Sequence, residues 1–187
     1  RRLREFTGKL PPLVIPKVDS AVELCELAQS LSDRSGPPAQ FVPMIETPKG
    51  LEVAACIASA LPAERIVALF FGAVDLSLEL GCALEWEPLL YARSRVIHAA
   101  RMADILAIDS PNLAIDNPVD LETEARRSAA LGFSGKAAIH PAQLGPINRA
   151  FTPTEAQLSR ARAVIEAYES MAGGGALRGG GRIEQPM

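Results

Sequence analysis

Residues 66–75, IVALFFGAVD, decide the fold class, because they join a short apolar run to a glycine and then to a carboxylate. A run this short, rich in aliphatic and aromatic side chains, is typical of a strand buried on both faces, as in a parallel sheet. The chemistry of parallel α/β folds sits in the loops after the carboxyl ends of the strands. The stretch therefore predicts a buried strand with Asp75 at the functional edge of a sheet.

Four more apolar runs of similar length occupy the chain on either side of this one: Leu13–Pro16, Phe41–Ile45, Ile105–Ile108 and the weaker Lys136–Ile139. Pro43 counts against the second run, since proline lacks a ladder donor. Amphipathic stretches with helix-capping residues separate the runs. Asn117 is predicted to begin one helix, which ends at Gly132. The Thr152–Glu155 capping box is predicted to begin another helix. Alternating strands and helices predict the α/β class with a parallel sheet.

Composition excludes several classes of protein. The 187 residues carry a net charge of −3, are 48% hydrophobic and only 5% aromatic, which fits one globular domain and disfavours nucleic-acid binding. The longest apolar runs are too short to span a bilayer, and the first residues lack the apolar core of a signal peptide. Cys25, Cys56 and Cys82 lack a CxxC pairing. We therefore expect a cytoplasmic protein without membrane or nucleic-acid partners.

Each apolar run is followed by an ionisable residue, and these are Lys17, Glu46, Asp75, Asp109 and His140. Glu46 and Asp75 are one strand–helix–strand step apart, so they should enter the same crevice from neighbouring strands. Two adjacent carboxylates repel unless a cation such as Mg2+ neutralises them. The alternative is that each carboxylate is a surface loop residue or a helix cap, and spacing alone leaves both interpretations open.

The remaining candidates also have two interpretations. Lys17 is either a phosphate or carboxylate contact or a solvated loop residue, and His140 either contacts substrate or fixes its own loop. Arg93, Arg95 and Arg101 lie along one predicted helix, where surface ion pairs are the ordinary expectation. The sequence contains no GxSxG elbow and no glycine-rich nucleotide loop of the two common kinds, which disfavours acyl-enzyme chemistry and those modes of nucleotide binding.

Three blocks in this order carry a family resemblance: PKV (16–18), PMIETPKGL (43–51) and FGAVDL (71–76). It continues through YARSRV (91–96), AID (107–109) and GFSGKAAIHP (132–141), which Gln143 follows. Together they resemble the citrate lyase β-subunit-like group, the CoA-ester lyases, of the HpcH/HpaI aldolase family. The likeness covers nearly the whole chain.

The resemblance implies a (β/α)8 TIM barrel of the phosphoenolpyruvate/pyruvate type, a carbon–carbon lyase that acts on β-hydroxyacyl-CoA. It implies Mg2+, with Mn2+ as a substitute, held by Glu46 and Asp75 as metal ligands and catalytic residues. Lys17, Gly72, Asp109 and His140 are then expected to contact the acyl-CoA substrate. Citryl-CoA, malyl-CoA or citramalyl-CoA would be cleaved to acetyl-CoA and a keto acid. The alternatives are a thioesterase or malate synthase, and a CoA-ester-binding or regulatory subunit without catalysis.

The C-terminal part carries a further expectation. Relatives use a tail aspartate as acid/base at a neighbouring subunit's site, and Glu184 stands in that place here, which predicts a homo-oligomer, a trimer or hexamer. Residues 1–172 are expected to be strands 4–8 of the barrel with a helical extension, and 173–187 a glycine-rich flexible tail or lid. The family's first three strands and their substrate arginine have no counterpart in this sequence, so weak or no lyase activity is expected of this chain alone.

Overall fold

The computed structural model of the chain describes residues 10–32, 36–62, 64–170, 177–179 and 182–184. The chain forms two compact units, Arg1–Phe151 and Thr152–Met187. The first unit contains the parallel sheet and every predicted site residue except Glu184.

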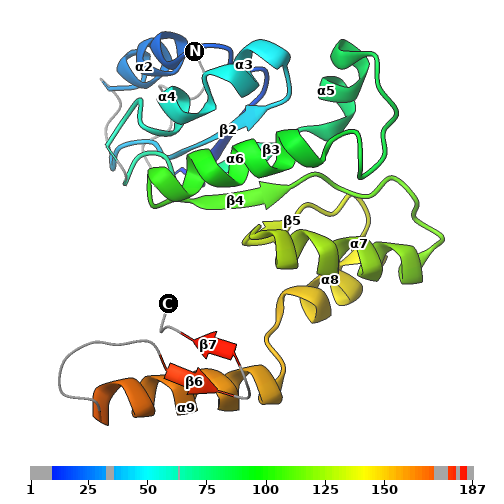
Figure 1. Ribbon diagram of the computed structural model, residues 1–187. Coiled ribbons are helices and arrows are strands. Elements are labelled where there is room, and N and C mark those ends of the chain that lie inside the picture. The colour runs from blue at the N-terminus through cyan, green and yellow to red at the C-terminus, as the bar shows by residue number, and fades with distance from the viewer. Residues whose placement is uncertain (1–9, 33–35, 63, 171–176, 180–181, 185–187) are drawn as a thin grey trace. The chain divides into compact units, whose positions relative to one another are not determined.

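The sheet has five parallel strands, β1 (Leu13–Ile15), β2 (Phe41–Ile45), β3 (Ala68–Phe71), β4 (Leu106–Asp109) and β5 (Gly135–Lys136). They overlap the five predicted runs, the last of them only at Lys136, and lie side by side in chain order (Figure 1). A doubly wound sheet reverses its strand order at a switch point, whereas a barrel adds each strand next to the last. The order β1-β2-β3-β4-β5 is that of an arc of a barrel, and it excludes the doubly wound arrangement.

Pro43 occupies the middle of β2 because the ladder to β3 is interrupted there. Phe41 bridges to Ile66, whereas Met44 pairs with Phe70, so the register shifts by one residue between the two pairs. The Phe41 N–H donates toward this same neighbour, to Arg65 O, and the N–H that proline lacks would face the same way. A shift of this kind is a bulge, one of the few places where a strand tolerates proline.

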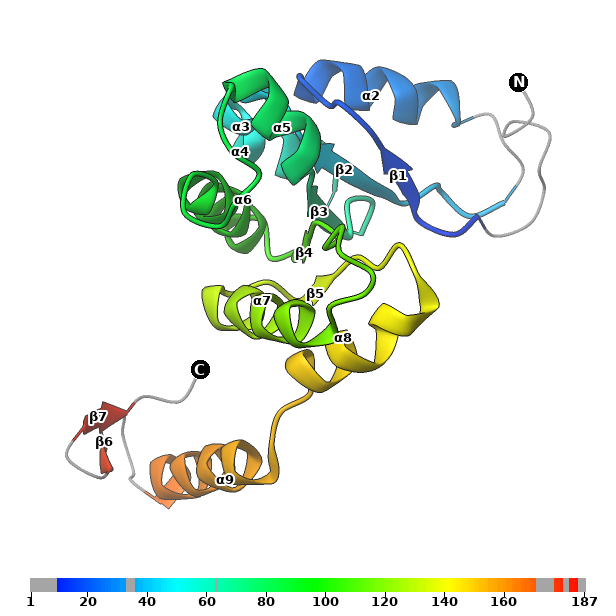
Figure 2. The same cartoon turned by 90° about the vertical axis from the view of Figure 1, so that its right-hand side faces the viewer.

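Helices connect the strands: α2 (Ala21–Ser30), α3 (Pro48–Glu52), α4 (Ala54–Ala58), α5 (Ala73–Leu80), α6 (Leu90–Met102) and α7 (Pro118–Leu131). Helix α2 packs on α4, and α4 packs on α6, so these helices lie along one side of the sheet (Figure 2). The core between sheet and helices contains fully buried side chains such as Phe41, Phe71 and Leu76. After β5 come a short 3-10 helix, η1 (Pro141–Gln143), and α8 (Leu144–Phe151), which packs on α7.

The predicted ends of α7 are confirmed. Asn117 caps the first turn by accepting a hydrogen bond from the Asp120 N–H, and Pro118 occupies the first helical position. Gly132 ends the helix in the left-handed region at φ 119°, a conformation that glycine adopts without steric cost.

The second unit consists of α9 (Glu155–Ser170) and a two-stranded antiparallel sheet, β6 (Leu177–Gly179) and β7 (Arg182–Glu184). The predicted capping box is wrong by two residues: Thr154 and Gln157 form it, since the Gln157 N–H donates to Thr154 Oγ1 and the Thr154 N–H to Gln157 Oε1. The T-x-x-E/Q pattern occurs twice in succession, and the helix starts at the second copy, beyond Pro153. Residues 171–176 lie outside the described part, so the boundary at 172 stays a prediction.

Candidate functional site

Glu46 is the first residue after β2, and its carboxylate is buried, with only 4% of the residue exposed. The backbone N–H of Lys17, which follows β1, donates to Glu46 Oε1 at 2.8 Å. Lys17 adopts φ 49°, a conformation uncommon for residues other than glycine. The chain therefore turns sharply at the end of β1 where its N–H donates to the Glu46 carboxylate.

Asp75 lies in the first turn of α5, directly after β3. The N-cap of the helix is Gly72, which approaches Glu46 so closely that a Cβ there would lie 2.4 Å from Glu46 Cβ and 2.6 Å from Glu46 Oε2. Gly72 is thus the residue that lets β3 and α5 pass beside the Glu46 side chain. The sequence placed Asp75 just beyond the strand, and the structure makes this position a helical first turn, where the helix dipole stabilises a carboxylate.

The electrostatics of the pair favour a cation. Burial raises the pKa of the Glu46 carboxyl, and the neighbouring Asp75 carboxylate raises it further, while the Lys17 N–H acts in the opposite direction. Like charges this close are stabilised by a divalent ion between them. Among the described residues no group of three His, Cys, Asp or Glu side chains could hold a metal. Two carboxylates with further sites left to water and ligand oxygens fit the way Mg2+ is commonly held.

The raised pKa of Glu46 predicts an effect on stability without metal. The Glu46 carboxyl has a higher pKa in the folded than in the unfolded chain. Its contribution to stability is therefore complete at pH values below its pKa in the unfolded chain, and it is lost as the pH rises through its pKa in the folded chain. Glu46→Gln keeps an oxygen that can accept from Lys17 and removes the charge. In chelator at pH 7.5 we expect the variant to melt a few degrees above the wild type, and at pH 4 to melt with it. A lower Tm at pH 7.5 would contradict the prediction.

Asp109 occupies a different environment. It ends β4 and is fully buried, and its Oδ2 accepts hydrogen bonds from Ser128 Oγ at 2.6 Å and Lys136 Nζ at 2.9 Å. Its Oδ1 accepts from Arg93 Nε at 3.2 Å. Lys136 also forms an ion pair with Glu124 at 2.6 Å. Asp109 therefore joins α6, α7 and β5 in a buried network, and a direct substrate contact remains only a prediction for it.

The loops after β4 and β5 are tied to this network and to each other. Lys136 Nζ donates to Ser110 O at 2.7 Å, and the buried Gln143 donates to Asn112 O at 2.8 Å while its own Oε1 accepts from the Ile139 N–H. His140 Nδ1 accepts a hydrogen bond from the Ala142 N–H at 3.2 Å, so it caps η1. This is the loop-fixing role considered for His140. Contact of Lys17, Gly72 and His140 with substrate stays a prediction.

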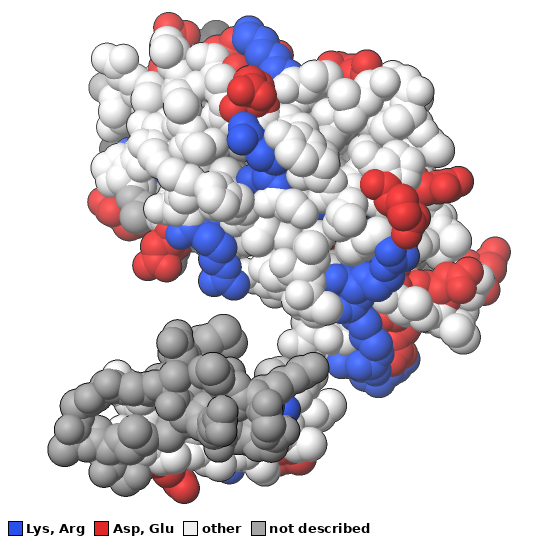
Figure 3. Space-filling model, viewed as in Figure 1, with Lys and Arg blue, Asp and Glu red and all other residues white. Residues whose placement is uncertain are grey.

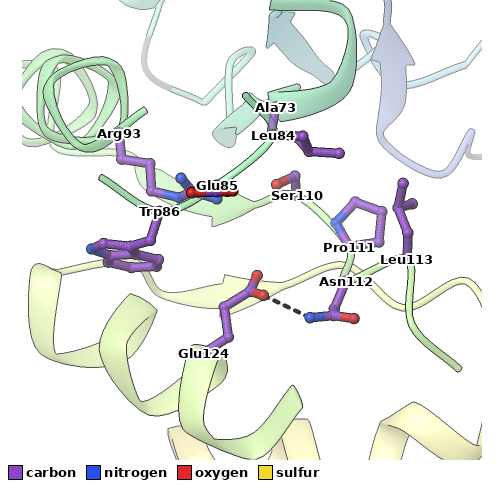
Figure 4. A pocket seen from close by; sticks show the side chains of 10 residues that line it. All are labelled: Ala73, Leu84, Glu85, Trp86, Arg93, Ser110, Pro111, Asn112, Leu113 and Glu124. Atoms are coloured by element: carbon purple, nitrogen blue, oxygen red, sulfur yellow. Dashed lines mark hydrogen bonds between the residues drawn. The ribbon is translucent and has the colours of Figure 1, made fainter. Parts of the chain in front are cut away.

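A pocket of about 250 Å³ opens beside this network, between the loop that follows α5, helix α6 and the loop after β4 (Figure 4). Its lining includes Trp86 and Arg93, which the sequence did not single out as site residues. The expected surface ion pair for Arg93 is wrong, because only 4% of this residue is exposed. The signal was present: Arg93 precedes Val96 by three residues and shares its buried helix face with Ala92 and Ala100.

A protein-family model described as HpcH/HpaI aldolase/citrate lyase matches residues 5–141, which include the whole parallel sheet. The chain belongs to this family. The match confirms the resemblance found in the sequence blocks and agrees with the chain-ordered parallel strands.

Individual relatives of this HpcH/HpaI family member support the same family assignment. A citrate lyase subunit beta-like protein of Deinococcus radiodurans is 35% identical and covers 99% of this chain and 66% of its own length. An L-malyl-CoA/beta-methylmalyl-CoA lyase of Cereibacter sphaeroides is 29% identical over 90% of this chain and 60% of its own. The crystal structure of the protein CitE from Mycobacterium tuberculosis, in complex with magnesium, acetoacetate and coenzyme A, is 30% identical with a TM-score of 0.75.

That CitE alignment covers 96% of this chain and 63% of the CitE chain, so the HpcH/HpaI chain spans about two thirds or less of the relatives it matches. The likeness confirms the predicted fold class, a TIM-barrel-type α/β fold present here in part.

On the face shown in Figure 3, acidic and basic side chains are interspersed. Within the described residues we find no helix with the length and apolar character required to cross a membrane.

Proposed function

We propose that this chain is the metal-binding part of a Mg2+-dependent carbon–carbon lyase that cleaves a β-hydroxyacyl-CoA to acetyl-CoA and a keto acid. The observation that carries the proposal is the pair Glu46 and Asp75, which the ends of β2 and β3 bring together around Gly72. The magnesium, acetoacetate and coenzyme A with which CitE forms its complex support it. So does the malyl-CoA lyase activity named for the Cereibacter relative.

Each residue of the site has a distinct task. Glu46 and Asp75 would hold the metal, and the Lys17 N–H, which donates to Glu46 Oε1, fixes the orientation of that carboxylate. When bound, Mg2+ supplies Lewis-acid polarisation of the carbonyl that forms on cleavage. Gly72 is the N-cap residue of helix α5 and gives it no side-chain cap. The first N–H groups of the helix are therefore available to a substrate carboxylate, which a helix N-terminus favours.

Metal-dependent stabilisation tests the site. At a free Mg2+ concentration about a hundred times Kd, binding to the native state adds about 2.7 kcal/mol, which raises Tm by roughly 5–10 °C. We expect Glu46→Gln and Asp75→Asn to lose this shift, measured by thermal melts with and without chelator. Glu79→Gln, an exposed position on the same helix, should retain it. Equal shifts in all four proteins would refute a metal site at Glu46 and Asp75.

The released products separate the lyase from its alternatives. Because weak or no activity is expected of this chain alone, the assay uses a protein that also supplies the family's first three strands. With malyl-CoA or citryl-CoA and Mg2+, a lyase then releases acetyl-CoA, and Glu46→Gln and Asp75→Asn should abolish that release. A thioesterase releases free CoA instead. A CoA-ester-binding or regulatory subunit would show the metal-dependent Tm shift and a substrate-dependent one, with neither product formed.

The acid/base role of Glu184 at a neighbouring subunit is part of the same proposal. Glu184 ends β7, and its side chain lies outside the described part of the structure. The role requires an oligomer, a trimer or hexamer, whose mass light scattering would measure. If the role holds, Glu184→Gln lowers turnover and leaves the Mg2+-dependent Tm shift unchanged, because no metal contact is removed.

A further inference from the structure

The turn after β2 connects to Asp19, a half-buried residue of the loop between β1 and α2, through the side chain of Thr47. Thr47 directly follows Glu46, is buried, and caps α3 by accepting a hydrogen bond from the Gly50 N–H at 2.9 Å. Its hydroxyl donates its own proton to Asp19 Oδ1. One hydroxyl, used as acceptor and as donor, therefore links the residue after Glu46 to the β1–α2 loop.

The rest of the β1–α2 loop is also fixed by hydrogen bonds. The Lys17 N–H donates to Glu46 Oε1 at 2.8 Å, and the Val18 N–H donates to Met44 O at 3.4 Å. Ser20 ends the loop by accepting a hydrogen bond from the first turn of α2. Each residue from 17 to 20 therefore forms a hydrogen bond, and the first of these bonds orients the Glu46 carboxylate.

Lys17 has a backbone conformation that needs such support. Its φ of 49° lies in the left-handed region, which residues other than glycine seldom adopt, and such conformations persist only where the surrounding structure imposes them. The first turn of α3 packs closely on the loop, since a Cβ at Gly50 would lie 2.5 Å from Val18 O and 3.5 Å from Asp19 Oδ1. Without the bond to Asp19, the loop would be free to relax away from the conformation that points the Lys17 N–H at Glu46.

We propose that Asp19 is a positioning residue for the metal site, which through the Thr47 hydroxyl holds the β1–α2 loop where the Lys17 N–H orients the Glu46 carboxylate. The inference rests on the proposed function, in which Glu46 and Asp75 hold Mg2+. Among the described residues Asp19 does not join these two in a group of three that could hold a metal, so it acts through Glu46. The arrangement requires the acceptor oxygen of Asp19 and not its charge, so an asparagine fills the same role.

Calorimetric titration with Mg2+, at a temperature at which every variant is folded, tests the inference. Loss of a group that orients a metal ligand typically weakens metal binding by about 10- to 100-fold. We therefore expect Asp19→Ala to raise the Mg2+ Kd about tenfold or more, and Asp19→Asn to recover most of that loss. Asp116→Ala removes an exposed carboxylate and should leave the Kd unchanged. Wild-type affinity in Asp19→Ala, or an Asp19→Asn variant as weak as Asp19→Ala, would overturn the proposal.

Amide hydrogen exchange measured by NMR in chelator tests the same role without metal. Asp19→Ala should speed the exchange of the Lys17 amide severalfold, because its hydrogen bond to Glu46 opens more often. The Ala137 amide, which donates to Asp109 O at 2.9 Å elsewhere in the sheet, should exchange as in the wild type, and Asp19→Asn should protect Lys17 again.

The two measurements separate this inference from the proposed function. If the wild type bound no Mg2+, the proposed function would fail, whereas the Lys17 amide would still show whether Asp19 holds the loop. Unchanged exchange at Lys17 in Asp19→Ala would refute the positioning role. Equal acceleration at Lys17 and Ala137 would also refute it, since Asp19 would then only stabilise the fold as a whole.

Discussion

Asp109→Asn is expected to lower the free energy of unfolding by about 3–5 kcal/mol, the range for breaking a buried ion pair. The Asp109 side chain is fully buried, and it is contacted by Arg93, itself 5% exposed, and by the fully buried Lys136. The neutral amide would leave both cations without their shared anion. Its NH2 group would also face Ser128 Oγ and Lys136 Nζ or Arg93 Nε, all of which are donors to Asp109 in the wild type.

Urea unfolding followed by Trp86 fluorescence, together with thermal melts, measures this loss. A change of 3–5 kcal/mol corresponds to a fall in Tm of roughly 6–20 °C for a chain of this size. Asp116→Asn is the matched control, since it makes the same chemical change at an exposed position and should alter stability by less than about 0.5 kcal/mol. If the two variants were equally stable, the buried network would not stabilise the fold.

Gly72→Ala is expected to disable the carboxylate pair. The new methyl would overlap Glu46, whose Cβ lies 2.4 Å and whose Oε2 lies 2.6 Å from the added atom. Glu46 is itself buried and tied to the Lys17 N–H, so it has little room to yield. Overpacking of this kind costs about 1–3 kcal/mol, and the displaced carboxylate should lose the Mg2+-dependent rise in Tm as completely as Glu46→Gln does.

Thermal melts with and without Mg2+ separate the two effects of Gly72→Ala. Gly135→Ala is the control, because an added Cβ at Gly135 meets no atom within 4 Å and the backbone there is not in the left-handed region. The control should keep both its stability in chelator and its metal response. A full Mg2+ response in Gly72→Ala would show that Glu46 is not required in its present position.

Much of this arrangement could be predicted because each strand and helix of a parallel α/β fold has a local pattern in the sequence, and the site lies in the loops that follow the strands. Short apolar runs predicted four strands closely and the fifth only at Lys136. The residues after the first three runs, Lys17, Glu46 and Asp75, lie together, whereas Asp109 and His140 have other environments. Asp75 was placed correctly relative to β3, although the helix that starts at Ala73 was not foreseen: the run IVALFFGAV continues without a polar break from strand into helix. Pro43 argued against β2 and is accommodated by the register shift at that point.

The sequence by itself determined the succession of strands and helices, the parallel class and the pair Glu46 and Asp75, since these depend on hydrophobic period and on spacing within one strand–helix–strand step. Only the tertiary structure decided which charges are buried together. Asp109, Arg93 and Lys136 come from a strand, a helix and the next strand. The helix pattern marks the position of Arg93 as buried, but no local pattern shows that the three charges meet. Their pairing arises because the packing of α6 and α7 against β4 and β5 excludes water, and buried charges are stable only next to partners.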